Sequence, residues 1–413
     1  MANCELRIEN VRDVSDLIFD GVPGAALLEG WGDETTDEVP WRILLPWPEE
    51  TRTLPWERAG EWKSFLAGLE DFEPSPVDGP ESAAPFVSGW VGFISYEAMA
   101  SEEAVTPRAD RPPEPAAFFA LHRHALYLDA PDLADPRPPA SSAVVHDSFA
   151  GGAYGRAVGR IRNAIRDGDV YQVNLTRSFT VQERRDPAQL YRTLTGPQPP
   201  RSSAFLRGDG WSIASASPEV LLRFDRNTGV AESKPIKGTV RRGDAGAVDA
   251  LLASDKDASE HLMIVDVVRN DFGRIAPPGA VSVPAFRTVQ TLEHVHHLES
   301  TVRATGLQGR SLTDVLAALS PAASITGAPK RAAVQMIRDV EPVPRGVYCG
   351  AIGYLDFRGH AELSVAIRTA VATDDEVRYH AGGGIVWDSD AAAEDDETRA
   401  KSAAFLKFAG AGT

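Results

Sequence analysis

The order of strand-like and helix-like segments after residue 149 constrains the fold of this chain more than any other feature. Tyr154, Val158, Ile161 and Ile165 are spaced 4, 3 and 4 residues apart, which predicts one face of a helix. The alternating run 170–176 then predicts a half-buried strand. Further strands and helices follow without a regular strand–helix–strand repeat, so the sequence predicts an α+β fold rather than a doubly wound sheet.

The other predicted elements are equally mixed. Strands are expected near 85–96, 117–128, 281–292, 295–302, 347–355, 362–372 and 376–381, and on either side of 217–219. Helices are expected over 258–272, from 330 onward with Pro329 at the first helical position, and over about 391–408. A stretch rich in Pro and Ala at about 129–148 predicts a linker between an N-terminal β-rich region, 1–148, and a second region, 149–413.

The charge of the chain limits its partners. Its 413 residues include 42 basic and 59 acidic ones, a net charge of −17. No nucleic-acid partner is expected, since phosphate binding needs a basic face. No run of 18 apolar residues predicts a membrane span, and no secretion signal is expected at the N-terminus. Cys4 and Cys349 allow at most one disulfide, so a reducing cytoplasm is the expected location.

A lysine near the middle of the chain is held between a proline and a glycine. Pro235 fixes its own φ, and Gly238 lets the backbone come close to a neighbour. In a dry site, or beside another cation, Lys237 can lose its proton and act as a nucleophile. Glu219 lies 18 residues earlier, on an expected neighbouring strand, where it can protonate a leaving group. The alternative is a surface turn with a solvated lysine.

Two expected helices carry paired acids. Asp257 and Glu260 are three residues apart, as are Glu394 and Glu397, so each pair shares a helix face and can bind a hard cation such as Mg²⁺. The alternative is two solvated acidic faces. Lys401 follows Glu397 by four residues, which is either an ordinary helix salt bridge or a cation directed at the same cleft.

Two further features can bind an anion. Gly382, Gly383 and Gly384 offer consecutive backbone N–H groups to a carboxylate, although such a run is also typical of a bulge or turn. Arg368 lies in the middle of the apolar run 364–369, where a cation needs an anion nearby. That anion can belong to a ligand or to a structural ion pair.

Zinc chemistry and glutamine hydrolysis are not favoured. His294, His296 and His297 lie close in sequence, but no convincing further ligand is near them. Neither cysteine lies in a glycine-rich nucleophile turn, so the chain is expected to carry no glutaminase of its own.

Taken together, these segments resemble the chorismate-utilising enzymes, and most closely the aminodeoxychorismate synthase branch. The matching segments are 167–176, 217–219, 235–239, 260–271, 325–330 and 380–386. The resemblance is close over 149–409 and looser before it. It implies two orthogonally packed antiparallel β-sheets with helices outside and an active site between them.

A few side chains separate the branches of this family. Anthranilate synthases resemble this chain but carry alanine at the position of Lys237, and isochorismate and salicylate synthases carry lysine at that of Gln172. The resemblance therefore implies that chorismate and ammonia are converted to 4-amino-4-deoxychorismate, for p-aminobenzoate and folate synthesis. The alternatives are an anthranilate synthase component I and a non-catalytic chorismate or tryptophan binder. For the latter, Leu27, Leu28 and Glu29 faintly resemble a tryptophan-binding segment of relatives.

The resemblance also implies roles for individual residues. Glu219 would protonate the C4 hydroxyl as Lys237 attacks C2, and ammonia would then enter at C4 and expel the lysine. A separate glutamine amidotransferase subunit would supply the ammonia. Mg²⁺ would be held by Glu260 and Glu397, with Asp257 and Glu394 beside them. The residues expected around chorismate are Arg368, Tyr348, Gly382, Gly383, Gly384, Lys401, Thr239 and His297.

Overall fold

The strands of the chain form two large sheets. The computed structural model describes Ile18 and residues 21–31, 41–70, 84–105, 108–127, 143–244, 246–291 and 295–410. Sheet A consists, in spatial order, of β16 (Gly327–Ala328), β8 (Gln172–Val181), β20 (Val377–Ile385), β19 (Thr369–Thr373), β10 (Trp211–Ala216), β9 (Ser203–Arg207), β1 (Ala26–Trp31), β2 (Trp41–Leu45) and β6 (Leu126–Tyr127), with β7 (Val145–Asp147) paired to the end of β8. Sheet B consists of β13 (Ile236–Arg241), β15 (Val295–Ala304), β12 (Val230–Lys234), β11 (Val220–Asp225), β18 (His360–Val365), β17 (Ala351–Asp356), β4 (Gly89–Ile94), β5 (Ala117–His122) and β3 (Glu50–Leu54), with β14 (Val281–Thr291) paired along β15.

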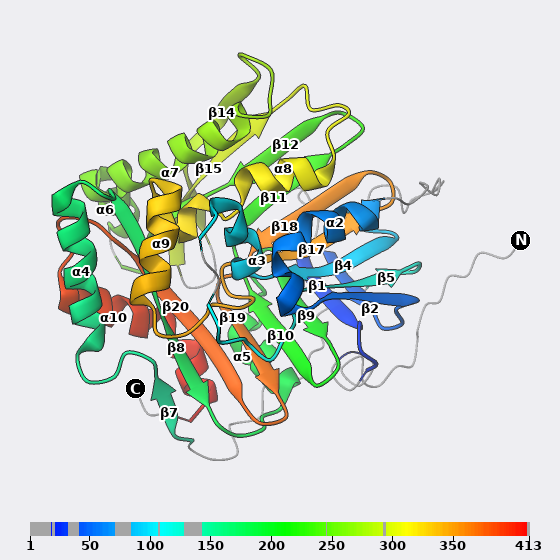
Figure 1. Cartoon of the computed structure of the whole chain (residues 1–413), viewed down its shortest axis with the longest axis horizontal. Helices are drawn as coiled ribbons and strands as arrows, with labels where there is room; N and C mark the ends of the chain where they lie inside the picture. Colours follow the sequence, from blue (N-terminus) through cyan, green and yellow to red (C-terminus); the bar gives the residue numbers. More distant parts are fainter. Residues whose placement is uncertain are drawn as a thin grey trace, which may run out of the picture.

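The two sheets pack against each other. Within the described residues every strand pair is antiparallel. In Figure 1, β8, β20 and β19 of sheet A run across the direction of β11, β12 and β18 of sheet B. Apolar side chains of both sheets share one core cluster, against which Trp211 of β10 packs edge-on to Phe93 of β4 and Phe118 of β5, at 5.5 and 5.1 Å between ring centroids.

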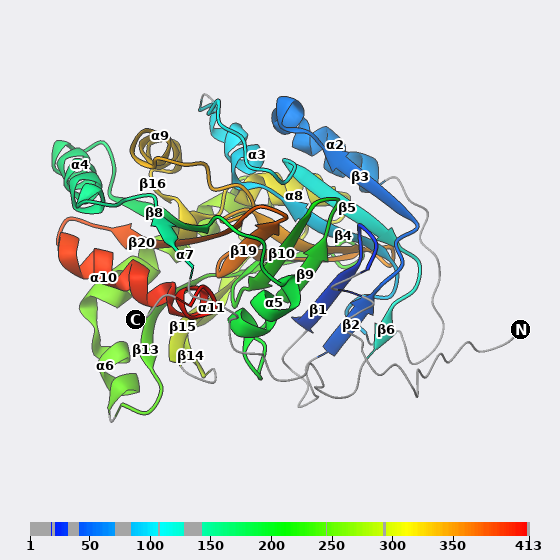
Figure 2. The ribbon, with the colours of Figure 1, turned by 90° about the horizontal axis from the view of Figure 1, so that it is seen from below.

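Helices surround the sheets, as Figure 2 shows from below. They are α2 (Trp62–Glu70), α3 (Tyr96–Ala100), α4 (Ala153–Asp167), α5 (Pro187–Thr195), α6 (Ala247–Ala253), α7 (Asp255–Gly273), α8 (Leu312–Leu319), α9 (Lys330–Val340), α10 (Ala391–Lys401) and α11 (Ala403–Phe408), with 3₁₀ turns η1 (Trp56–Glu61), η3 (Ser101–Glu103) and η4 (Ala323–Ile325). The predicted α+β class with two antiparallel sheets and outer helices is therefore confirmed.

The longest helix, α7, carries one of the predicted acid pairs. Ser254 caps its start, because the Ser254 hydroxyl accepts a hydrogen bond from the N–H of Asp257 at 3.2 Å. Its apolar side, including Ile264, Val265 and Val268, is buried in the main core cluster. The N-terminal half of α7 therefore has a fixed position beside β13 and β15.

One predicted strand is two strands in different sheets. The run 362–372 was expected to be continuous, with Arg368 in its middle, but β18 ends at Val365 in sheet B and β19 begins at Thr369 in sheet A. Arg368 has a φ of 50°, which is uncommon for a residue with a side chain. Strands that change sheets bend at a corner, and the apolar pattern continues across this corner because both halves are buried.

Three smaller predictions are also wrong. The three glycines lie inside β20 rather than beyond it, because β8 pairs with β20 as far as Ile385. The final helix is two helices, α10 and α11, which meet at Ser402. Pro329 is the N-cap of α9 and not its first helical residue.

The N-terminal region contributes strands to both sheets. β1, β2 and β6 extend sheet A, whereas β3, β4 and β5 extend sheet B. Of the predicted linker, residues 129–142 lie outside the described part of the chain, and residues 145–147 form β7. The division of the sequence at 148 stays a prediction. Among the described residues, no helix combines the length and apolar character needed to cross a membrane.

Candidate active site

Lys237 lies on β13 beside a bulge. The pairing of β13 with β15 shifts between Lys237 and Thr239, and Gly238 has a φ of 82°. His261 of α7 supports this bulge, since its Nδ1 lies 3.3 Å from the carbonyl oxygen of Lys237 and its Nε2 lies 2.6 Å from Ser300 Oγ. His261 was not predicted as a site residue, although its place next to Glu260 on an apolar helix was a usable signal.

The surroundings of Lys237 lower the pKa of its amine below the ordinary value. Burial lowers the pKa of Lys237, and the charge of Lys401 lowers it further, while Glu260, Glu219 and Glu397 act in the opposite direction. The amine also lies close to the part of β20 that contains Gly382–Gly384, called the glycine strand below. A Cβ on Gly384 would be 3.6 Å from Lys237 Nζ. Lys237 is therefore a candidate nucleophile.

Glu219 is a buried acid in the loop before β11. Only 5% of its surface is exposed, and burial raises its pKa to about 7, against the effects of the Ser324 hydroxyl and the charge of Lys237. The backbone N–H of Ile236, next to Lys237, donates a hydrogen bond to it. Near neutral pH a large fraction of Glu219 is therefore protonated beside the lysine. Ser324 of η4 was not identified from the sequence.

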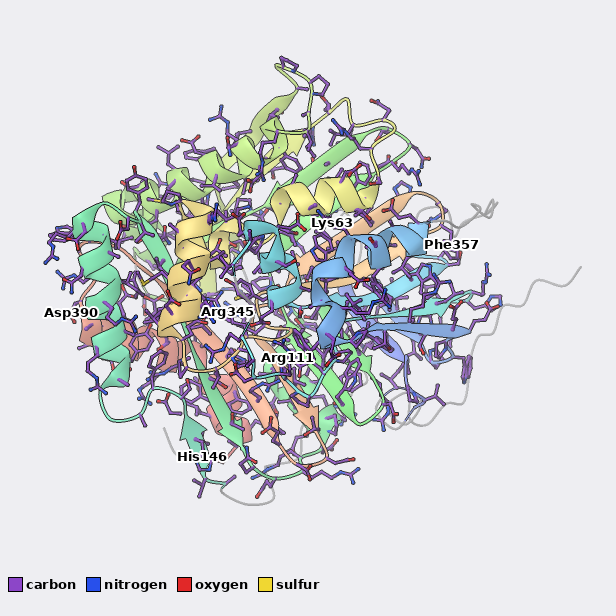
Figure 3. All side chains as sticks on the ribbon, in the orientation of Figure 1. Lys63, Arg111, His146, Arg345, Phe357 and Asp390 are labelled. Carbon is purple, nitrogen blue, oxygen red and sulfur yellow. The ribbon has the colours of Figure 1, made fainter. Side chains whose placement is uncertain are left out.

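The acids of α10 lie against the glycine strand. Asp390 caps α10 and is labelled in Figure 3. Glu394 is 4% exposed and accepts a hydrogen bond from Ser389 Oγ at 2.7 Å. A Cβ on Gly383 would lie 3.1 Å from Glu394 Oε2 and 3.8 Å from Glu397 Oε1, so this glycine leaves room for both carboxylates.

Lys401 joins the same helix to the strand. Its Nζ lies 2.6 Å from Glu397 Oε1 and donates a hydrogen bond to the carbonyl oxygen of Gly382 at 3.0 Å. The predicted salt bridge is thus present, and it also holds the lysine at the glycine strand. Asp257 of α7 packs against Gly238 of β13, since a Cβ on Gly238 would be 3.4 Å from Asp257 Cγ.

The residues present suit Mg²⁺ held partly by the protein. Within the described residues, no three His, Cys, Asp or Glu side chains already gather around one point. Glu260 of α7 and Glu397 of α10 both act on the charge of Lys237, so two carboxylates approach one site from different helices. Mg²⁺ commonly uses one or two protein carboxylates and takes its remaining ligands from substrate and water. This oxygen-only donor set fits that coordination.

Arg368 is a cation at the corner between the sheets. Among the described residues, no carboxylate forms an ion pair with it. Its charge acts on His297, whose pKa is lowered to about 4 by burial, by Arg368 and by Arg201, so this imidazole is neutral at pH 7. Arg368, a cation without a carboxylate partner among the described residues and beside a neutral imidazole, is suited to bind an anionic ligand.

Tyr348 is fixed next to this corner. Its turn is joined to the corner by hydrogen bonds from Cys349 N to Ala366 O, at 2.8 Å, and from Ala366 N to Gly350 O, at 2.9 Å. The Tyr348 ring stacks on His380, with centroids 5.3 Å apart. Backbone hydrogen bonds therefore join the segment that carries Tyr348 to the segment that carries Arg368.

The glycine strand has one open edge. The ladder between β19 and β20 ends at Tyr379, whereas the ladder between β8 and β20 continues to Ile385. Within the described part of the chain, Gly382–Gly384 thus face no partner strand on the β19 side. Backbone groups of an antiparallel strand alternate between its two edges, so only part of this run faces the open edge, where the carbonyl of Gly382 already accepts a hydrogen bond from Lys401 Nζ.

Some predicted residues stand apart from this group. Thr239 is exposed and pairs with His297 across the β13–β15 ladder. His294 lies outside the described residues, and His296 Nδ1 is 2.9 Å from Thr291 Oγ1. Glu29 is 2% exposed, and its carboxylate bonds to Arg42 and to the Tyr191 hydroxyl.

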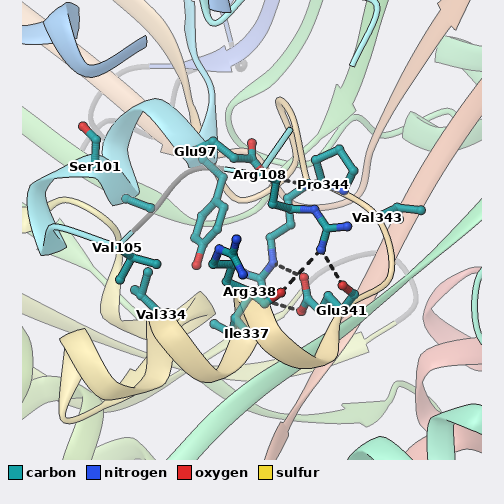
Figure 4. A pocket seen from close by; sticks show the side chains of 13 residues that line it. Glu97, Ser101, Val105, Arg108, Val334, Ile337, Arg338, Glu341, Val343 and Pro344 are labelled. Carbon is teal, nitrogen blue, oxygen red and sulfur yellow. Dashed lines mark hydrogen bonds and ion pairs between the residues drawn. The ribbon is translucent and has the colours of Figure 1, made fainter. Parts of the chain in front are cut away.

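A separate pocket of about 50 Å³ lies between α3 and α9 (Figure 4). None of the predicted site residues lines it. Its wall includes the buried pair Glu341 and Arg345, joined at 2.7 Å. This pair supports β8, because Glu341 accepts from the N–H of Thr176 at 2.8 Å and Arg345 donates to the carbonyl of Asn174 at 2.9 Å. The pocket therefore adjoins the side chains that support β8, the strand paired with Gly382–Gly384 of β20.

Replacing Arg345 with methionine is expected to lower the free energy of unfolding by about 3–5 kcal/mol, because it leaves Glu341 buried without its cation. Urea unfolding followed by circular dichroism measures this loss. Arg166→Met removes an exposed ion pair with Asp167 and should leave the midpoint unchanged. Equal midpoints for both variants would contradict the supporting role of the buried pair.

Comparisons with known proteins show the family of this chain. The model of the chorismate binding enzyme family matches residues 48–407, so the chain belongs to this family. Aminodeoxychorismate synthase component 1 of Klebsiella aerogenes is 36% identical over 347 residues, which cover 77% of this chain and 76% of that protein. The aminodeoxychorismate synthase of Streptomyces pristinaespiralis is 42% identical over 365 residues, which cover 78% of this chain but 50% of that protein. The chain thus spans about half the length of several relatives.

The fold is also that of a solved relative. The crystal structure of anthranilate synthase component I from Streptococcus pneumoniae TIGR4 matches with a TM-score of 0.76 and 26% identity, over 90% of this chain and 94% of that one. The predicted resemblance and fold are therefore confirmed, while aminodeoxychorismate synthases and an anthranilate synthase component I are both among the relatives.

Proposed function

We propose that this chain is an aminodeoxychorismate synthase, which converts chorismate and ammonia to 4-amino-4-deoxychorismate. One observation carries the proposal. A lysine whose pKa is lowered by burial lies beside a buried carboxyl group whose pKa is about 7. A neutral amine and a protonated acid form a nucleophile and general-acid pair, which a binding protein does not need.

In the proposed reaction, Lys237 bonds to C2 of chorismate while Glu219 gives its proton to the C4 oxygen, which leaves as water. Ammonia then bonds to C4, the ring double bonds shift back, and the bond between C2 and Lys237 breaks. Burial of Glu219 keeps its proton available near neutral pH. His261 positions Lys237 by holding its backbone carbonyl.

The substrate's two carboxylates have separate proposed sites. Arg368, Tyr348 and the open edge of Gly382–Gly384 would bind the enolpyruvyl carboxylate, with His297 beside the ring. Glu260 and Glu397 would hold Mg²⁺, with Asp257 and Glu394 next to them and Lys401 at the same end. The cation would supply positive charge to the ring carboxylate, which offsets repulsion from an acidic protein.

Ammonia is proposed to come from a separate glutamine amidotransferase chain. Burial raises the pKa of the Cys349 thiol to about 12, so this cysteine is not suited to act as the thiolate nucleophile of a glutaminase. The proposed product belongs to p-aminobenzoate and folate synthesis, in the cytoplasm.

The test is to incubate the purified chain with chorismate and ammonium salt, with and without Mg²⁺, and to identify the product by mass and NMR. An amino group at C4 supports the proposal. Anthranilate, or an amino group at C2, would assign the chain to the neighbouring branch. Chorismate binding without turnover, even with a glutaminase subunit added, would favour a binding protein.

Replacing Arg368 with alanine is expected to raise KM for chorismate about 100-fold with a smaller change in kcat, because a charge-assisted bond to a carboxylate contributes about 3 kcal/mol. Steady-state kinetics measure both constants. Arg368→Lys should recover only part of the loss, since an ammonium cannot make the bidentate contact. An unchanged KM in the alanine variant would show that this cation does not bind substrate.

A further inference from the structure

Behind Glu219 lies a small cavity that the proposed reaction does not use. Its volume is about 10 Å³, and polar side chains of Glu219, Ser233, Asp271 and Ser324 line it together with apolar ones. A space of this size holds about one water molecule, and four polar neighbours are enough to bind it. The cavity therefore has room for a water molecule next to the general acid.

Asp271 of α7 separates this cavity from solvent. It is 3% exposed, and it lines both the small cavity and an open pocket of about 520 Å³. On the outer side, Lys330 Nζ lies 2.8 Å from Asp271 Oδ2, and Arg274 Nη2 lies 3.0 Å from Asp271 Oδ1. One carboxylate thus contacts an interior space on one side and cations of a solvent-filled pocket on the other.

Asp271, where the outer pocket adjoins the small cavity, lies well away from the proposed metal side of the site. Asp271 and Glu260 are 11 residues apart on α7, which corresponds to about 16 Å along the helix. Bound chorismate would cover the Lys237 side of Glu219. The small cavity is therefore an approach to Glu219 that substrate does not block.

We propose that Asp271 and a water molecule in the small cavity form a proton route that returns a proton from solvent to Glu219 in each turnover. This inference rests on the proposed function. In that reaction Glu219 loses its proton to the departing C4 hydroxyl, and ammonia forms a C4–N bond. The proton lost by Glu219 leaves in the departing water. Aliphatic amines are protonated at neutral pH, so the new ammonium group on C4 keeps its protons and returns none to Glu219. One proton per turnover must then come from solvent.

The charges around the route suit proton transfer. Burial raises the pKa of Asp271, and Lys330 and Arg274 oppose this rise. Glu103 also lies near this group, since Lys330, Arg274 and Asp271 all act on its charge. At the inner end, Lys237 and Glu299 act on Glu219, while the nearby Cys349 thiol stays protonated because burial raises its pKa to about 12. Two carboxyl groups with raised pKa values thus line one cavity of about the size of a water molecule.

The experiment compares the first turnover with later ones. In Asp271→Asn, the first loss of the C4 hydroxyl should keep its wild-type rate, because Glu219 begins protonated. The steady-state rate should fall about tenfold with KM for chorismate unchanged, and imidazole should restore it in a saturable way. Asp266→Asn is the matched control, since Asp266 lines only the open pocket and is 56% exposed, and it should behave as wild type.

Each other result overturns the route. If the wild type makes no 4-amino-4-deoxychorismate, the proposed function and the route fail together. If the wild type does so and Asp271→Asn keeps the full steady-state rate, the route fails alone. Equal slowing of first and later turnovers, without imidazole rescue, would mean a structural role for Asp271. Should Asp271→Asn not fold, Ser233→Val, which fills the cavity from β12, decides, and an unchanged steady-state rate in it would exclude the route.

Discussion

Replacing Lys237 with alanine is expected to lower the rate of 4-amino-4-deoxychorismate formation by roughly 10³-fold or more, because the variant lacks the atom that bonds to C2. Ammonia would have to attack C4 without a covalent intermediate. Product formation with ammonium salt, followed by chromatography and mass spectrometry, measures the loss.

Two controls make this result specific to the nucleophile. Lys407→Ala removes an exposed lysine of α11 and should leave the rate unchanged. Chorismate binding by Lys237→Ala, measured by calorimetry, should persist, because the proposed carboxylate contacts remain. Full activity in Lys237→Ala would remove the covalent mechanism and leave this lysine as a charge in the pocket.

Replacing Glu219 with glutamine is expected to lower kcat by about 10²–10⁴-fold, since the leaving hydroxyl would lose its proton donor. The wild-type rate should fall as pH rises through about 7, the pKa of the buried carboxyl. The glutamine variant cannot lose a proton and should lack this fall. A pH–rate profile that keeps it in the variant would assign the titration to another group.

The same carboxyl group predicts a change in stability with pH. Its pKa in the folded protein, about 7, lies above its ordinary value of 4.5, so folding favours the protonated form. This contribution is complete below pH 4.5 and is lost as pH rises through about 7. Glutamine resembles the protonated carboxyl, so between pH 5 and 8 the variant should lose less stability than wild type in urea unfolding. Parallel losses in both proteins would contradict the raised pKa.

Local sequence patterns predicted much of the fold and of the site. The apolar spacing of α4 and α7 and the runs of β14 and β15 are local signals, and all four elements are present. Lys237 and Glu219 were predicted as a pair from residue type and neighbours, and the structure brings them close enough for each to act on the charge of the other. The approach of Lys237 to Gly384 depends on sheet A lying against sheet B, which no local pattern contains.

The residues that were missed have positions set by long-range packing. Ser324 precedes a recognisable segment, but its place beside Glu219 depends on how η4 packs behind β11. The corner at Arg368 was taken for strand because the apolar side chains continue on both sides of it. A change of sheet leaves no mark in hydrophobic periodicity when both strands are buried.

Because Arg368 lies at that corner, the proposed contact with substrate depends on how sheet A and sheet B are joined. Val365 donates its N–H to the carbonyl of Glu219 at 3.0 Å, and Ala216 of sheet A donates to the carbonyl of Arg368 at 3.1 Å. Glu219, the proposed acid, and Arg368, the proposed contact for the enolpyruvyl carboxylate, are thus held at opposite ends of the short segment 366–368. A substitution anywhere in the interface that tilts one layer against the other would change the distance between them. Variants selected for altered substrate preference should therefore include positions remote from the ligand, in the core between the sheets.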